Sequence, residues 1–260
     1  MSPPLSPVLV LSLASLVSFG VGPTAHAQSL DARDPVEIER AIAAAAQPGD
    51  RARAQQLSAR IDAGLPAPLL TRAVDALVAN GSPPALSALR ALAGHRRAAI
   101  RAQSARGLAR IRGANARDVL AALLDDPEAE VRSAAAIALG TLGPQGVMDT
   151  VMLAALRGVS EAAILFAQQA NPQDVARFVR RLDAATLEPT APAVRILIAR
   201  ANLARPSRLA LVAKLRELGT GLPQTLLREV GATLPEGDPV RRAIDEAIAA
   251  LDAPAPEAGR

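Results

Sequence analysis

Cysteine, tryptophan and tyrosine are absent from this chain of 260 residues, and phenylalanine occurs only three times. The absence of cysteine excludes disulfide bonds, a lipid anchor on cysteine, thiolate metal sites and a cysteine nucleophile. A globular core of this size normally uses several large aromatic side chains, whereas short helices packed through alanine and leucine do not need them. The scarcity of aromatic rings therefore favours a stack of small helices.

The residues that are abundant favour helix. Alanine, leucine and arginine are among the best helix formers, and runs of strand-forming residues are missing. Lys214 is the only lysine, so the basic charge is almost entirely arginine. The formal net charge of +4 is mild and does not by itself imply a nucleic-acid partner. We expect an all-α protein.

The segment 1–27 reads as a secretory signal peptide. An uncharged, mostly apolar run from Val8 to Val21 is followed by a Gly-Pro helix breaker and by Ala25-His26-Ala27. This pattern predicts cleavage between Ala27 and Gln28, and therefore a periplasmic or secreted bacterial protein. The segment before the apolar run carries no lysine or arginine, which departs from the usual signal and leaves an uncleaved anchor as the alternative.

Proline and glycine divide the remaining chain into regular segments, from which we predict fourteen helices. Four of them begin with a capping side chain followed by proline: Asp34-Pro35, Asp126-Pro127, Asn171-Pro172 and Asp238-Pro239. The predicted helices span residues 35–47, 50–63, 66–80, 83–93, 96–112, 115–125, 127–142, 145–157, 159–170, 172–184, 190–204, 206–218, 223–234 and 238–252.

A repeat runs through these helices. Every second predicted helix starts at a nearly even spacing, at positions 66, 96, 127, 159, 190 and 223. The sequence also matches itself at this spacing, since Ile100-Arg101 aligns with Val131-Arg132 one period later. A fixed period of this length indicates stacked helical hairpins.

The clearest repeat lies at residues 125–143 and resembles the second helix of a bacterial HEAT repeat, with the pattern D-x-x-x-x-V-R-x-x-A-A-x-A-L-G-x-L-G. Residues 119–124 resemble the first helix of the same repeat. Val131, Ala135, Leu139 and Leu142 lie on one stripe of the second helix, and a single hairpin cannot bury such a stripe, so repeats stack and share a core.

The resemblance implies a right-handed α-α superhelical solenoid of about six to seven HEAT-like hairpins. We expect the solenoid to occupy residues 28–252, with charged caps near 31–62 and 238–252, followed by a disordered Ala/Pro tail at 253–260. In HEAT-like families an aspartate and an arginine six residues apart form a polar ladder between repeats. The resemblance therefore gives Asp126 and Arg132 a structural role rather than a catalytic one.

One segment has an unusual charge. Residues 76–117 contain eight arginines and no acidic residue. Arg106 and Arg110 are one helical turn apart and share a face, where like charges repel unless something offsets them. An anionic partner is one explanation, and solvent or pairing with acidic residues of adjacent repeats, such as Asp125 and Glu128, is the other. The candidate partner-binding residues are Arg97, Arg101, Arg106, Arg110 and Arg112.

These observations favour a non-catalytic, exported scaffold for protein–protein interaction. The alternatives are a binder of lipid headgroups or nucleic acid through the arginine-rich region 90–117, and an enzyme similar to HEAT-like lyases or glycosylases. The export signal and mild net charge argue against nucleic acid, while a membrane surface stays open. His95 is isolated, and the sequence contains no metal-ligand spacing, phosphate loop or nucleophile motif, so we expect no metal, cofactor, catalytic residue or small-molecule substrate.

Overall fold

The computed structural model describes residues 34–112 and 115–253. Within these residues the chain forms fourteen α-helices and no strand, which confirms the all-α prediction. The helices are α1 (Pro35–Ala45), α2 (Arg51–Asp62), α3 (Ala67–Asn80), α4 (Pro83–Leu92), α5 (Ala98–Ile111), α6 (Ala116–Leu123), α7 (Ala129–Leu142), α8 (Met148–Leu156), α9 (Ser160–Gln169), α10 (Pro172–Arg181), α11 (Ala184–Ala199), α12 (Arg205–Leu218), α13 (Leu222–Thr233) and α14 (Pro239–Asp252).

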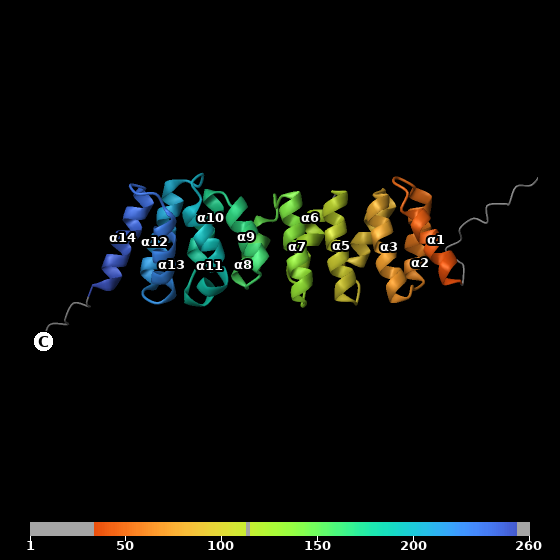
Figure 1. Ribbon diagram of the computed structural model, residues 1–260, viewed down its shortest axis with the longest axis horizontal. Coiled ribbons are helices and arrows are strands. Elements are labelled where there is room, and N and C mark those ends of the chain that lie inside the picture. The colour runs from red at the N-terminus through yellow and green to blue at the C-terminus, as the bar shows by residue number, and fades with distance from the viewer. Residues whose placement is uncertain (1–33, 113–114, 254–260) are drawn as a thin grey trace, which may run out of the picture.

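The helices follow one another along a single elongated row, with α1 at one end and α14 at the other (Figure 1). The odd-numbered helices form one continuous layer, because each from α1 to α11 packs on the next odd-numbered helix. In the second layer α2 packs on α4, and α8, α10, α12 and α14 pack in succession. This sequential packing is that of a HEAT-repeat solenoid, as predicted.

Several predictions for the chain ends cannot be compared with the structure. The predicted signal peptide, the cleavage junction between Ala27 and Gln28 and all but the first residue of the predicted tail lie outside the described residues. The predicted caps correspond to α1 with α2 and to α14, but their capping role stays a prediction. Among the helices of the described residues, none has both the length and the apolarity needed to cross a bilayer.

Side-chain caps fix several helix starts where the sequence predicted them. The side chains of Asp34, Asn171 and Asp238 each accept a hydrogen bond from a backbone N–H in the first turn of the following helix. Asp126 behaves differently, because its carboxylate accepts from Glu128 N while α7 begins only at Ala129. Its other contacts, described below, explain this difference.

The start of α11 corrects the prediction of a helix at 190–204. The helix begins at Ala184, since Asp183 and Thr186 form a reciprocal capping box that fixes the first turn. Pro189 and Pro192 then lie inside the helix, where each removes a backbone donor. The Thr190 hydroxyl donates to the carbonyl of Thr186 in this stretch. The two prolines resemble a helix boundary in the sequence, so the predicted start of this helix at residue 190 is too late.

Small side chains dominate the interface between successive odd-numbered helices. Val131, Ala135 and Leu139 are fully buried along α7, as the predicted stripe requires. A Cβ on Gly107 would lie 2.5 Å from Val78 Cγ2, so α3 and α5 approach too closely for a side chain at that point. The helices therefore stack at a spacing that alanine and glycine permit.

Ser104 is a polar residue in this core and gives a test of the packing. It is completely buried on α5, and its hydroxyl has no hydrogen-bond partner among the described residues. The equivalent residue one repeat later is Ala135. We expect Ser104→Ala to raise the free energy of unfolding by about 1 kcal/mol, because a buried hydroxyl without a partner costs stability. Ala135→Ser should lower it by a similar amount. Urea denaturation measures both changes, and a less stable Ser104→Ala protein would contradict the assignment.

Candidate functional site

The five candidate arginines do not form one cluster. Arg97 is the N-cap residue of α5, and Arg112 is its C-cap residue in a left-handed conformation with φ of 55°. A helix of 14 residues is about 21 Å long, so these two side chains start from opposite ends of α5. A small ligand cannot contact both ends of this helix at once.

Arg101 lies in a nearly buried ion pair between repeats. Its Nε and Nη2 atoms each donate to one carboxylate oxygen of Asp126, both at 2.7 Å. The Arg101 and Asp126 side chains are only 12% and 6% exposed. Two parallel hydrogen bonds of this kind hold both groups in a fixed geometry. This contact ties α5 to the turn before α7 and gives Arg101 a structural role between repeats, while its predicted role in partner binding stays a prediction.

Arg132 does not pair with the Asp126 carboxylate. Its Nη1 atom donates to the carbonyl oxygens of Asp126 and Pro127, each at 2.8 Å. Arg101 makes the same pair of bonds one repeat earlier, to the carbonyls of His95 and Arg96. The repeated arginine thus braces the turn before its own helix. At this junction the Asp126 carboxylate therefore pairs with the arginine of the preceding repeat, Arg101, rather than with Arg132 six residues later.

The Arg101 guanidinium lowers the pKa of the Asp126 carboxyl, chiefly by donating hydrogen bonds to the ionised form. The backbone N–H of Glu128 and the positive charge of Arg101 act in the same direction, while burial opposes them. Asp126 therefore stays ionised at neutral pH and serves as an anchor between repeats.

Arg106 and Arg110 remain on the exposed surface of α5. Arg106 pairs with Glu130 of α7 at 3.3 Å, and both side chains are more than half exposed. Arg110 is exposed and forms no ion pair with a described residue. Pairing with an acidic residue of an adjacent repeat thus occurs for Arg106, but its partner is Glu130 rather than Asp125 or Glu128, and Asp125 pairs with Arg157.

Arg112 lies at the edge of the molecule where α5 turns into α6. Together with Arg117, Asn115 and Gln145 it lines a shallow hollow of about 320 Å³. Arg117 is held there by donating to the carbonyls of Leu142 and Gly143. Asp118 also lines this hollow, so its two arginines face one carboxylate.

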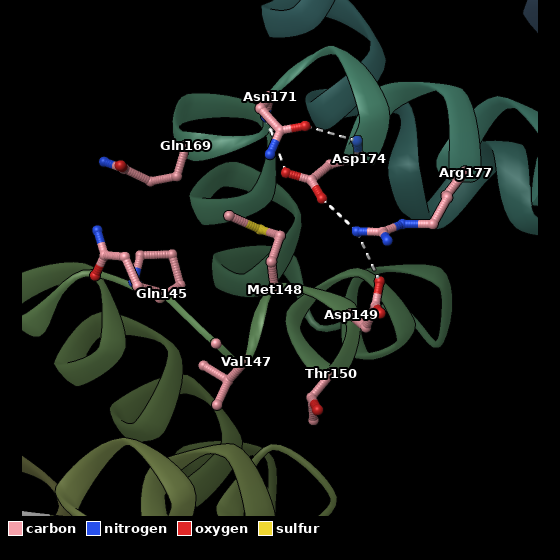
Figure 2. A pocket seen from close by; sticks show the side chains of 11 residues that line it. Gln145, Val147, Met148, Asp149, Thr150, Gln169, Asn171, Asp174 and Arg177 are labelled. Carbon is pink, nitrogen blue, oxygen red and sulfur yellow. Dashed lines mark hydrogen bonds and ion pairs between the residues drawn. The ribbon is translucent and has the colours of Figure 1, made fainter.

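A larger hollow of about 450 Å³ lies between the α7–α8 turn and the start of α10. Figure 2 shows Arg177 between Asp174 and Asp149, with Gln145 and Gln169 across the hollow. Arg177 Nη2 contacts Asp174 Oδ1 at 2.5 Å and Asp149 Oδ1 at 3.2 Å. Arg177 is therefore paired with two carboxylates at the wall of this hollow.

Sequence reasoning did not find this hollow. Asp174 belongs to the capping box of α10, where its Oδ2 accepts from Asn171 N at 2.9 Å. The only signal in the sequence was that residues 145–170 depart most from the repeat pattern. A departure of this kind marks an irregular stretch, but it does not specify which side chains come together.

The family of HEAT repeats matches residues 56–140 and 91–165 of the chain. No curated protein matches it. The matched segment runs from within α2 into α9, and it contains the Arg101–Asp126 pair together with the exposed arginines of α5. The residues of α10 that line the larger hollow, Asp174 and Arg177, lie outside the matched segment.

The Arg101–Asp126 pair predicts a pH-dependent stability. A carboxyl whose pKa is lowered by folding contributes stability above its unfolded value of about 3.9 and loses it as the pH falls through the lowered folded value. Asp126→Asn should therefore lower the melting temperature by about 4 °C at pH 7. The difference from wild type should shrink below pH 4. Thermal melts monitored by circular dichroism measure both, with the exposed Asp245→Asn as control; a constant difference at all pH values would contradict the assignment.

Proposed function

We propose that this HEAT-repeat chain is an exported, non-catalytic scaffold that binds a protein partner along its helical-repeat surface. The proposal rests on polar contacts that join odd-numbered helices on their exposed side, in succession from α1 to α9 and again between α11 and α13. The contacts are Glu39–Arg72, Asp75–Gln103, Arg106–Glu130, Ser133–Glu161 and Arg195–Glu229.

These contacts support a scaffold because they brace a long surface from one repeat to the next. Each exposed pair contributes little stability by itself, on the order of 0–1 kcal/mol. Several in succession restrict the relative movement of neighbouring helices at the surface. A repeat protein whose units contact only their neighbours presents an extended binding surface, and these contacts keep that surface in one register.

The exposed arginines favour a second candidate function, which is binding of an anionic surface such as lipid headgroups. Arg106, Arg110 and Arg112 lie on or beside α5, with Glu130 as the one carboxylate paired to them among the described residues. Contacts with lipid phosphates would weaken steeply as the salt concentration rises. A protein interface with apolar contacts would depend on salt much less, so salt dependence separates the two functions.

Export is the part of the proposal that depends on the segment 1–27. The apolar run and the Ala25-His26-Ala27 sequence before Gln28 support it. We therefore place the scaffold and its partner in the bacterial envelope or outside the cell.

The decisive measurement uses the native protein and its envelope. We expect N-terminal sequencing of the native protein to find a mature start at Gln28. A tagged chain that starts there should capture a stoichiometric envelope protein at both 50 and 500 mM salt. An unrelated exported protein with the same tag serves as control. An intact Met1 with a cytoplasmic location would overturn export, and capture of lipid alone, lost at high salt, would support the second candidate function instead.

A further inference from the structure

Three odd-numbered helices, α5, α7 and α9, share one exposed surface, which we call the α5–α9 face and define by Arg106, Arg110, Ile137 and Ile164. The Arg106–Glu130 pair crosses from α5 to α7 on this side of the molecule. The Ser133–Glu161 hydrogen bond crosses from α7 to α9.

Helical periodicity places the remaining residues on the same side. Ile137 follows Ser133 by four residues and therefore lies one turn further along the same face of α7. Ile164 follows Glu161 by three residues on α9, and Arg110 follows Arg106 by four on α5. The four defining residues thus occupy neighbouring helices and point outward.

Ile137 and Ile164 are exposed although nothing in the fold requires them to be apolar. Ile137 is 61% exposed and Ile164 is 39% exposed. One repeat before Ile137 the same position holds Arg106, and one repeat after it Gln168, so the stacking tolerates a charged or polar side chain there. The two helices also lie close together, because a Cβ on Gly140 of α7 would lie 3.6 Å from Leu165 Cδ1 of α9. Two neighbouring exposed isoleucines without a structural reason indicate a contact surface.

The unpaired charge of the α5–α9 face has one sign, because Glu130 is paired with Arg106 and Glu161 is hydrogen-bonded to Ser133. Within residues 104–111, 135–142 and 164–169, the only charged side chains are Arg106 and Arg110. Arg110 forms no ion pair with a described residue, and the exposed pair between Arg106 and Glu130 is weak enough for another carboxylate to replace Glu130. The face is therefore complementary to a segment that is both acidic and apolar.

We infer that the α5–α9 face binds an acidic segment of a partner protein, with apolar side chains on Ile137 and Ile164 and carboxylates on Arg106 and Arg110. This inference rests on the proposed scaffold function and names the chemistry of its partner. Three adjacent helices at 8–10 Å spacing span about 16–20 Å, which matches about five or six residues of extended chain.

A second copy of the chain fits this surface less well. An isologous contact would press the α5–α9 face against itself, and the arginines would meet only Glu130 and Glu161, which Arg106 and Ser133 already engage. An anionic lipid surface would satisfy the arginines as well, and the vesicle measurement below separates it from an acidic segment.

A substitution that introduces the residue found at the equivalent position of a neighbouring repeat should be compatible with the fold. Ile137→Arg introduces the residue found one repeat earlier, and Arg110→Thr introduces the residue found one repeat later, Thr141. Ile137→Arg removes the apolar contact while it adds a positive charge. Its effect therefore has opposite signs for an acidic apolar segment, which it should weaken, and for an anionic surface, which it should strengthen.

The test selects random 12-residue peptides displayed on phage against the full chain from Gln28. The selected peptides are then measured by fluorescence anisotropy. We expect peptides with net negative charge and several apolar residues. Their dissociation constant should rise about tenfold with Ile137→Arg and about threefold with Arg110→Thr. Leu153→Asp and Arg90→Thr alter exposed residues of the other helical layer and should leave it unchanged.

Several results would overturn the inference. These are selection of no peptides or of basic peptides, affinity that Ile137→Arg leaves unchanged, and stronger binding of this variant to phosphatidylglycerol vesicles. Self-association in analytical ultracentrifugation that Ile137→Arg abolishes would identify a second copy as the occupant and would also overturn it. An envelope partner that wild type and Ile137→Arg capture equally would overturn this face while leaving the scaffold function intact. Failure to capture any envelope protein would instead count against the scaffold.

Discussion

The close stacking of successive odd-numbered helices is the constraint on which the rest of this structure depends. Each helix of this layer contributes a buried stripe such as Val131, Ala135 and Leu139, and the stripe is shielded only when the next repeat covers it. Alanine and glycine at the contacts let the helices approach, as at Gly107 beside Val78. The same close approach brings side chains of neighbouring repeats within hydrogen-bonding distance on the exposed side. It therefore determines both the packing of the core and the polar contacts on the surface.

Hydrophobic stacking alone would fix the register of the repeats only loosely, because alanine surfaces are smooth and one helix could slide along the next. The Arg101–Asp126 pair supplies a directional contact at one such junction. Arg132 makes the same backbone contacts as Arg101, but the position one repeat after Asp126 is Arg157. The arginine–aspartate contact is therefore not repeated between α7 and α9, close to the turn between α7 and α8 where the larger hollow opens.

The parts of this fold that are local in sequence could be predicted, and those that depend on the stagger between repeats could not. All fourteen helices and the caps at Asp34, Asn171 and Asp238 follow from signals within a few residues. The partner of Asp126 is Arg101 of the preceding repeat, and only the offset between stacked helices selects it over Arg132. The hollow beside Arg177 likewise depends on the distance between the α7–α8 turn and the start of α10, and no pattern of neighbouring residues determines that distance.

In a repeat protein, equivalent positions of successive repeats can be compared to separate structural residues from functional ones. Where the fold requires a particular kind of side chain, equivalent positions in successive repeats carry it. Leu108 and Leu139 are an example, since both are completely buried. Where equivalent positions differ although their surroundings are similar, the fold has no preference and another requirement can decide. Position 137 is such a case, since arginine, isoleucine and glutamine occupy it in three successive repeats, all exposed. An isoleucine that stays mostly exposed within its own chain gains further burial only when a partner covers it.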